Sequence, residues 1–184
     1  MAQPAAAAVE TAARLEDFGL LVRAYRPKVF RFAFASLRDR DAAETVTQDC
    51  FFKAYKAWET FRQECRIDTW LMQIAVNLIR DHAHTRSFRF WTRAGVLAKP
   101  VEAISDCLAG NGCSPEKQVL LKEQVEAVWE AAAKLPGRQR TVFLLRFVED
   151  MDLLEIAAVT GMKEGTVKTH LFRALKTVRG RIGA

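Results

Sequence analysis

Apolar residues recur at spacings of three and four along almost the whole of this 184-residue chain, and no sustained alternation of apolar and polar residues competes with that pattern. This is the period of an amphipathic α-helix, whereas a half-buried strand would alternate. The pattern fails over residues 87–113, where glycine and proline recur and the apolar residues lose their period. So long an unstructured connection is uncommon inside a compact domain, which favours a linker. The sequence therefore predicts an all-α protein made of two small helical domains.

The break divides the chain into four predicted segments. They are a disordered N-terminal tail at residues 1–14, a helical domain at 15–86, a flexible linker at 87–113 and a second helical domain at 114–184. In the first domain, helices are predicted over 15–37, 42–58 and 70–84, with a kink or division at Pro27 and a loop over 61–68. In the second domain, helices are predicted over 115–135, 138–148, 152–161 and 165–179.

Composition narrows the class of protein. Half of the residues are hydrophobic and 27% are charged, as in a soluble globular protein. The N-terminus lacks the basic and apolar segments of a secretory signal, and no stretch reaches the ~18 apolar residues of a membrane span. Four cysteines without a CxxC pair suggest reduced thiols in a cytoplasm; they are Cys50, Cys65, Cys107 and Cys113. We therefore expect a cytoplasmic protein.

Charge and motif content favour binding over catalysis. The net charge is +6 and the pI is about 9.4, which favours a polyanionic partner. The sequence has no P-loop, GxGxxG motif or nucleophile–base pair, so we predict no enzyme, no cofactor and no small-molecule substrate. Asp81, His82 and His84 resemble a metal-ligand set, but the two histidines, two residues apart on a helix, point in different directions. No metal site is predicted.

Residues 153–175 have the form of a helix-turn-helix. Asp152 and Glu155 have the spacing of a capping box, and Gly161 supplies a left-handed turn residue. Small side chains are expected to let the two helices approach, and apolar side chains to form their shared core. The small residues are Ala157 and Ala158, and the apolar residues are Ile156, Val159, Val167 and Leu171.

The second helix of this motif is strongly basic. Six lysines and arginines fall between residues 163 and 181, against Glu164 alone. Such a helix suits the major groove of DNA, with its N-terminal residues near base edges and others on phosphates. The alternative is a solvated basic face on an ordinary three-helix bundle, since basic residues suit helix C-termini. The coincidence of turn, small residues and charge favours DNA binding.

Several stretches resemble one family in its own order. Residues 43–58, AETVTQDCFFKAYKAW, resemble regions 2.1–2.2 of the extracytoplasmic-function (ECF, group IV) sigma factors of bacterial RNA polymerase, in the sigma-70 family. Phe61, Arg62, the run TWLMQIAVN at residues 69–77 and Asp81 resemble regions 2.3–2.4. Residues 135–146 and the helix-turn-helix resemble region 4. The resemblance covers residues 18–86 and 114–181.

The resemblance implies three binding surfaces. The surface that docks on the clamp helices of the largest polymerase subunit corresponds to Glu44, Gln48, Asp49 and Lys53. The −10 element corresponds to Phe61 and Arg62, in the loop at 61–66 that captures a flipped base, and to Gln73, Asn77 and Asp81 on one helix face. The −35 element corresponds to Arg146, Gly165, Thr166, Lys168, Thr169, His170, Arg173 and Lys176, of which Arg146 and Lys176 would contact phosphates. Two assignments have structural alternatives: Asn77 bridging within the bundle, and Phe172 packing in the bundle rather than contacting DNA.

The resemblance also implies partners. They are core RNA polymerase, through the clamp helices and the flap of the second-largest subunit, promoter DNA, and an anti-sigma factor. The anti-sigma factor is often membrane-bound, and would then hold the protein at the inner membrane face. The predicted function is promoter-specific initiation with strand opening. One rival is a stand-alone helix-turn-helix regulator in which residues 1–113 sense a signal or dimerise. A third hypothesis is a helical enzyme with a metal at Asp81, His82 and His84.

Overall fold

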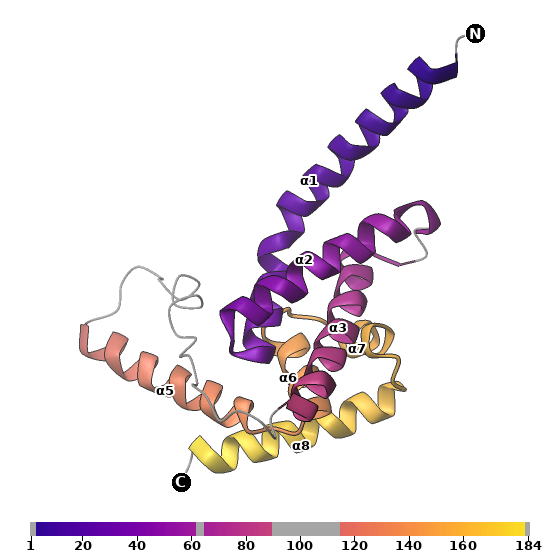
Figure 1. Ribbon diagram of the computed structural model, residues 1–184. Coiled ribbons are helices and arrows are strands. Elements are labelled where there is room, and N and C mark those ends of the chain that lie inside the picture. The colour runs from indigo at the N-terminus through magenta and orange to yellow at the C-terminus, as the bar shows by residue number, and fades with distance from the viewer. Residues whose placement is uncertain (1–2, 62–64, 90–114, 183–184) are drawn as a thin grey trace.

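The computed structural model describes residues 3–61, 65–89 and 115–182, and every regular element among them is helical (Figure 1). The first group is α1 (Gln3–Leu37), α2 (Arg40–Ala57), the short 3-10 helix η1 (Trp58–Thr60) and α3 (Ile67–Arg89). The second group is α5 (Pro115–Ala133), α6 (Gly137–Phe147), α7 (Leu153–Thr160) and α8 (Glu164–Ile182). The all-α prediction is confirmed. None of the described helices combines the length and apolarity needed to cross a bilayer.

The first three helices pack around a shared apolar core. Phe18 contacts Tyr55 and Arg26 pairs with Glu44, so α1 and α2 run antiparallel. α3 packs against both helices. The side chains at the centre are fully or almost fully buried; they are Val29, Phe32, Val46, Cys50, Leu71, Met72 and Ala75. Their helical spacing is the source of the pattern seen in the sequence.

The last four helices form a second bundle, in which α8 packs against α5, α6 and α7. Its centre consists of apolar side chains with little or no exposure, namely Leu135, Val142, Leu144, Leu145, Ile156, Val159, Val167, Ala174 and Val178. The predicted motif core is confirmed at Ile156, Val159 and Val167, whereas Leu171 is half-buried at its edge. Ala157 is half-buried but Ala158 is exposed, so only Ala157 lies between packed helices.

Local signals fix several helix ends, the two ends of α7 as predicted and the start of α2 two residues before its predicted position. The Asp152 carboxylate accepts from the Glu155 amide at 2.8 Å, and the Glu155 carboxylate accepts from the Asp152 amide at 2.9 Å, which is a complete capping box. Gly161 ends α7 with a φ of 68°, in the left-handed region that glycine tolerates best. Asp39 caps α2 by accepting from the Ala42 amide at 3.1 Å.

The first helix differs from its prediction. It begins at Gln3 rather than at residue 15, and it continues without division through Pro27. Residues 5–8 are alanines, which have the highest helix propensity, and they extend the helix toward the N-terminus. Apolar residues on both sides of Pro27, including Leu21 and Val29, are buried against the bundle, and this packing carries the helix past the proline.

The third helix also differs. It begins at Ile67, before the predicted start at Trp70, and it reaches Arg89 rather than His84. Asp68 therefore lies in the first turn of the helix. Its carboxylate accepts from the Thr69 amide at 2.9 Å and from Lys28 of α1 at 3.3 Å. The Asp68 carboxylate therefore links α3 to α1.

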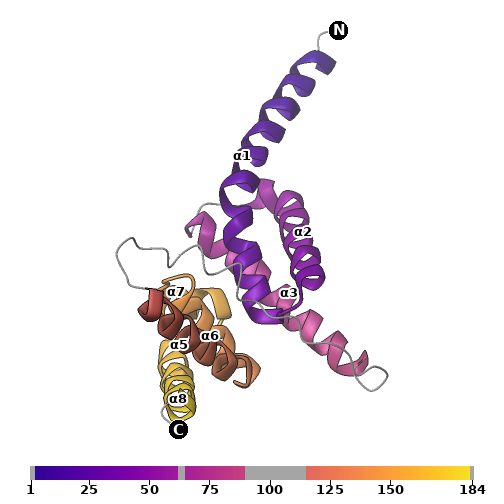
Figure 2. The same cartoon turned by 90° about the vertical axis from the view of Figure 1, so that its left-hand side faces the viewer.

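The two bundles lie against each other. α7 packs on α3, and α6 packs on α1. Figures 1 and 2 show the two groups of helices side by side, with the N-terminal part of α1 projecting beyond both. Predicted features at residues 90–113, including Cys107 and Cys113, lie outside the described part of the chain.

Candidate nucleic-acid and protein interfaces

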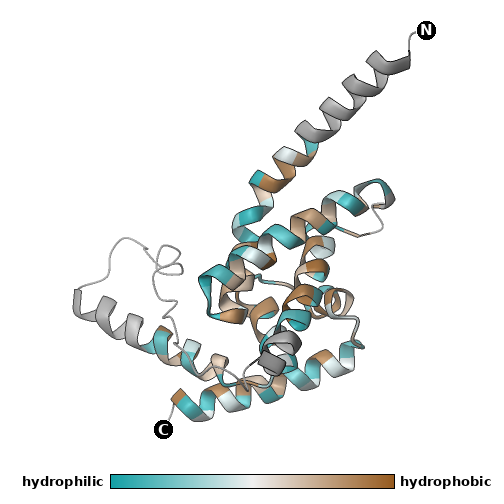
Figure 3. Cartoon of the chain, in the orientation of Figure 1, coloured by the Kyte–Doolittle hydropathy of each residue, from teal (hydrophilic) through white to brown (hydrophobic). Residues whose placement is uncertain are grey.

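The outward face of α8 carries nearly all of the residues predicted to read DNA. Val167, Ala174 and Val178 are buried on the opposite face. The exposed candidates are Gly165, Thr166, Lys168, Thr169, Arg173 and Lys176. Figure 3 colours much of this helix as hydrophilic. The arrangement gives one continuous polar and basic surface, the form expected of a helix that enters the major groove.

Two members of the same predicted set are placed differently. His170 is half-buried, and its Nδ1 is buried without a hydrogen-bond partner among the described residues. It lies at the edge of the bundle core. Arg146 donates to the Met151 carbonyl at 3.0 Å and lies 3.8 Å from the Asp150 carboxylate. Its guanidinium therefore stabilises the turn after α6, although 39% of the side chain remains exposed.

Phe172 lies on the exposed face of α8. The side chain is 69% exposed, so the alternative in which it packs into the bundle is wrong. It lies among basic and polar neighbours, between Lys168 and Lys176 along the helix. An exposed aromatic ring on such a surface is suited to apolar contact with a thymine methyl group.

The outer face of α3 brings together three predicted −10 residues. Gln73, Asn77 and Asp81 follow one another at four-residue intervals, so they share a face. Gln73 and Asp81 are exposed, and Asn77 is half-buried. Met72 differs from these residues because it is almost fully buried. It belongs to the bundle core, not to the surface beside Gln73.

The loop before α3 contains the candidate for base capture. The Phe61 ring stacks on Trp70, with centroids 4.6 Å apart, and lies 6.3 Å from Trp58. Half-buried Phe61 is therefore part of an aromatic cluster at one end of the first bundle. Arg62 lies outside the described residues. Arg66, at the end of the loop, is bound to Asp68 at 3.0 Å.

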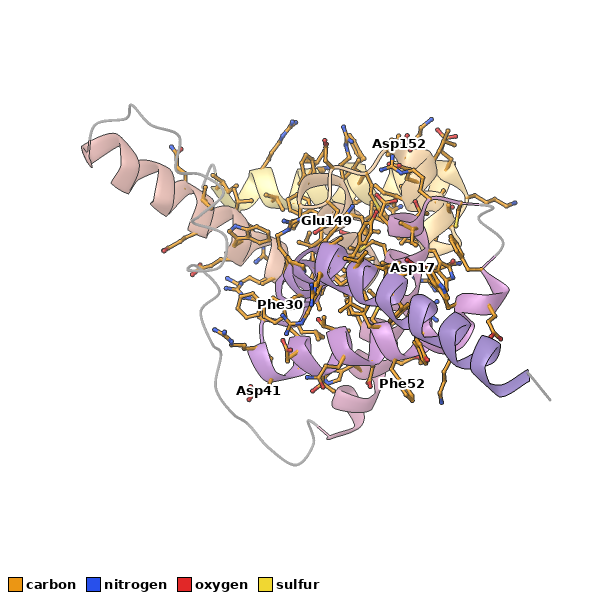
Figure 4. All side chains as sticks on the ribbon, turned by 90° about the horizontal axis from the view of Figure 1, so that it is seen from above. Asp17, Phe30, Asp41, Phe52, Glu149 and Asp152 are labelled. Atoms are coloured by element: carbon orange, nitrogen blue, oxygen red, sulfur yellow. The ribbon has the colours of Figure 1, made fainter. Side chains whose placement is uncertain are left out.

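The outer face of α2 carries the predicted polymerase-docking residues. Gln48, Asp49 and Lys53 are exposed, whereas Glu44 is half-buried and paired with Arg26 of α1. The outer face of α2 also contains a residue that we did not predict from the sequence. Phe52 is 58% exposed, and the Lys56 ammonium lies 4.3 Å from its ring centroid. Figure 4 shows Phe52 at the outer side of α2.

The omission of Phe52 has a simple origin. The resemblance assigns only polar residues to this surface, and Phe51 is the buried member of the adjacent pair of phenylalanines. Phe52 follows Gln48 by four residues, so helical spacing places it on the exposed face. An exposed aromatic residue among polar groups is typical of a protein-binding surface.

No group of three or more histidine, cysteine, aspartate or glutamate side chains is placed to hold a metal ion within the described part of the chain. Burial raises the pKa of the Cys50 thiol to about 12, against a smaller lowering effect of Lys53. This thiol is therefore protonated and unreactive at neutral pH. The side chain of Cys65, in the 61–66 loop, is exposed to solvent.

Two family models match the chain in succession: Sigma-70 region 2 over residues 21–89, and Sigma-70 region 4 over residues 125–178. The RNA polymerase sigma-H factor of Pseudomonas aeruginosa is 31% identical over 162 residues, which cover 88% of this chain and 83% of that protein. The ECF sigma-E factor of Haemophilus influenzae is 30% identical over 90% of this chain and 87% of its own length. The chain belongs to the ECF sigma factors. The ECF sigma factor SigW of Bacillus subtilis is 27% identical over 91% of this chain and 89% of its own length.

Solved structures agree with this fold. The sigma factor RpoE of Bartonella quintana, in complex with the anti-sigma factor NepR, superposes with a TM-score of 0.70 at 20% identity. The match covers 92% of this chain and 98% of that one. CnrH, in complex with the cytosolic domain of CnrY, gives a TM-score of 0.63 at 21% identity over 90% and 87% of the two chains. In this sigma factor, α1–α3 correspond to region 2, and α5–α8 carry region 4. Residues 21–89 match region 2 and not the separate sensing domain that the stand-alone regulator would require.

Proposed function

We propose that this sigma factor recruits core RNA polymerase to specific promoters and helps to open the DNA there. The single observation that carries the proposal is the succession of region 2 and region 4 on one chain. Each region also presents an exposed polar face of the kind its task requires. On this proposal the chain supplies recognition and strand capture, and nucleotidyl transfer belongs to the polymerase.

Three surfaces would bind the polymerase and the two promoter elements. The outer face of α2, with Gln48, Asp49 and Lys53, would dock on the clamp helices of the largest subunit, and Phe52 would add an apolar anchor to that contact. The face of α3 and the 61–66 loop would bind the −10 element. The outer face of α8 would read the −35 element. Region 4 would also contact the flap of the second-largest subunit.

An anti-sigma factor is proposed as the regulatory partner. The RpoE structure described above contains the anti-sigma factor NepR, and CnrH was solved with the cytosolic domain of CnrY. An anti-sigma factor would cover the docking faces of both regions. A membrane-bound anti-sigma factor would hold the protein at the inner face of the membrane until a signal releases it.

Run-off transcription with sigma-free core polymerase on a pool of genomic fragments tests the proposal. We expect promoter-specific initiation with the wild-type chain, loss of initiation with Asp49→Arg and reduced opening with Asn77→Ala. The matched control is Glu130→Arg, which makes the same charge change at an exposed position of α5. This variant should initiate like the wild type.

The outcomes separate the candidates. Specific initiation that fails with Asp49→Arg but not with Glu130→Arg supports both the sigma role and the docking face. Sequence-specific duplex binding without any initiation would contradict the proposal and favour a stand-alone regulator. Equal loss with both variants would remove the α2 face from the docking surface.

A further inference from the structure

Two acids lie against cations of region 4 that are predicted to contact DNA. The Glu164 carboxylate is 2.6 Å from the Lys168 ammonium, one turn further along α8. The Asp150 carboxylate is 3.8 Å from the Arg146 guanidinium, in the turn after α6. Each pair spans four residues, so each acid belongs to the same local segment as its cation. Both cations therefore carry an intramolecular anion at the surface where DNA phosphates would bind.

Other basic residues of the same surface differ from these two. Arg173 and Lys176 are exposed on α8, and neither forms an ion pair with another side chain among the described residues. The surface thus contains paired cations, one before α7 and one within α8, beside cations that are open to a DNA ligand. The acids act on particular positions and do not neutralise the whole face.

The turn after α6 does not require the charge of Asp150. This residue has a φ of 51°, in the left-handed region that glycine tolerates best and that asparagine and aspartate also adopt. Its side chain is 99% exposed, and its carboxylate pairs with Arg146. Arg146 also donates to the Met151 carbonyl at 3.0 Å, a bond that holds the guanidinium without the carboxylate. Asparagine would fit the same backbone, so what the acid adds is negative charge beside Arg146.

Glu164 has a structural alternative. An acid in the first turn of α8 suits the positive end of the helix dipole, and a glutamate four residues before a lysine is the favourable order of such a pair. However, this end of α8 is the one expected to approach DNA, where a carboxylate repels phosphates. The two roles predict different results when the charge is removed. Loss of helix stabilisation would leave DNA binding equal or weaker, whereas loss of repulsion would strengthen it.

We propose that Asp150 and Glu164 are built-in competitors of DNA phosphates, each at the cation with which it pairs. They keep the sequence-independent affinity of region 4 for DNA low. This inference rests on the proposed function, because it assumes that this face binds promoter DNA. Phosphate contacts carry no sequence information, so binding then depends more on residues that reach base edges, such as Arg173. A chain that binds random DNA weakly stays available for promoters.

Electrostatics gives the expected size of the effect. A carboxylate about 4–8 Å from a phosphate in water weakens binding by about two- to sixfold. Each cation released to contact a phosphate steepens the slope of log affinity against log salt by about 0.9. The slope reports the number of phosphate contacts, so a purely structural role of either acid would not change it.

Titration of the full-length chain onto a labelled random-sequence duplex, at several salt concentrations, tests the proposal without polymerase. Asp150→Asn and Glu164→Gln should each bind about two- to sixfold tighter, with a slope steeper by about 0.9. The matched control is Glu130→Gln, which makes the same change in net charge at an exposed position of α5 and should keep the wild-type slope. Urea denaturation followed by circular dichroism verifies that each variant stays folded.

A double variant shows whether Glu164 acts through Lys168. In a Lys168→Gln background the ammonium that would contact a phosphate is gone, so adding Glu164→Gln should leave the slope unchanged. Unchanged slopes in both single variants would overturn the competition, even where the wild type initiates at promoters and the proposed function stands. Equal steepening by Glu130→Gln would also overturn it, by assigning the effect to net charge. Steeper slopes in a chain that never initiates with polymerase would support the competition but contradict the proposed function.

Discussion

Phe61 stacks on Trp70, with ring centroids 4.6 Å apart and ring planes inclined by 28°. Trp58 lies beside both rings, at 6.3 Å from Phe61 and 6.4 Å from Trp70. The aromatic residue proposed to capture a base thus has a rigid support behind it. A base that leaves the DNA stack gains from packing on such a platform, because the ring does not have to be ordered on binding.

Replacing Phe61 by alanine removes this platform. We expect Phe61→Ala to weaken binding of a −10 single strand to the holoenzyme by about 1–3 kcal/mol, the range for one base–aromatic stack. Phe61→Tyr keeps the ring and should bind almost like the wild type. Fluorescence anisotropy with a labelled non-template strand measures the difference. Equal weakening by both substitutions would show that the ring does not act by stacking.

Arg31 of α1 binds Glu149 after α6, and this pair makes the contact between the two bundles sensitive to pH. Burial raises the pKa of Glu149 above the ordinary value of 4.5, so the packed carboxyl binds its proton more tightly than it would with the bundles apart. This contribution to the contact is complete below pH 4.5 and is lost as the pH rises through the raised pKa. Asp68 acts within region 2. Burial raises its pKa, but Lys28, the Thr69 amide and Arg66 together outweigh burial and lower it below 3.8, so its contribution to the stability of region 2 is lost only in stronger acid.

The pH effect is tested by scattering in increasing urea between pH 4.5 and 8. We expect the bundles of the wild-type chain to separate at lower urea as the pH rises, and those of Glu149→Gln to separate at the same urea concentration throughout. The amide has the shape of the neutral acid and lacks a charge to desolvate, so it should keep the bundles together at neutral pH. A pH dependence that persists in Glu149→Gln would assign the effect to another group.

Gly161 is required by its backbone angle and not by space. Its φ is 68°, yet an added Cβ would meet nothing within 4 Å. Gly161→Ala should therefore destabilise region 4 by about 1 kcal/mol through left-handed strain alone. Gly180→Ala is the matched control, since this exposed helical glycine also has open space around it. It should raise stability by roughly 0.5–1 kcal/mol. Urea denaturation followed by circular dichroism measures both changes.

The features that the sequence predicted correctly are those with a local cause. The capping box of Asp152 and Glu155 and the turn at Gly161 depend on residues within a few positions of one another. The extension of α1 through Pro27 was missed because packing against α2 and α3 overrides the local preference. Arg31 and Glu149 are 118 residues apart, and no period or motif links them. A contact between separate bundles leaves no such pattern in the sequence.

Two errors within the candidate sites were avoidable. Phe52 shares a helix face with Gln48, and His170 lies near the buried face of Val167 and Ala174. Assigning each residue its angle around the helix would have added Phe52 to the docking surface and moved His170 to the edge of the core. The family motif gave the right helix in both cases, and only the helical geometry distinguishes the faces.

The cysteines should differ sharply in reactivity. Burial raises the pKa of Cys50 to about 12, and its thiol contacts the Leu71 carbonyl at 3.5 Å, whereas Cys65 is exposed. In a variant with Cys107→Ser and Cys113→Ser, a maleimide at pH 7.5 should label one thiol in the folded protein and two in denaturant. Mass spectrometry identifies the labelled residue. Labelling of Cys50 in the folded state would show that region 2 opens readily.

Arg173 and Lys176 lie on the same exposed face of α8 but should contribute differently to DNA binding. An arginine can donate two hydrogen bonds to a guanine, so Arg173→Ala should cost about 1–3 kcal/mol on the cognate −35 duplex and relax the preference at one base pair. Lys176→Ala removes a phosphate contact, so it should weaken all sequences alike and reduce the slope of log affinity against log salt by about 0.9. Titrating both variants on a panel of single-base −35 variants at several salt concentrations separates base reading from charge. If Arg173→Ala lowers every affinity equally, Arg173 contacts only the backbone, and sequence reading falls to Thr166, Thr169 and Phe172.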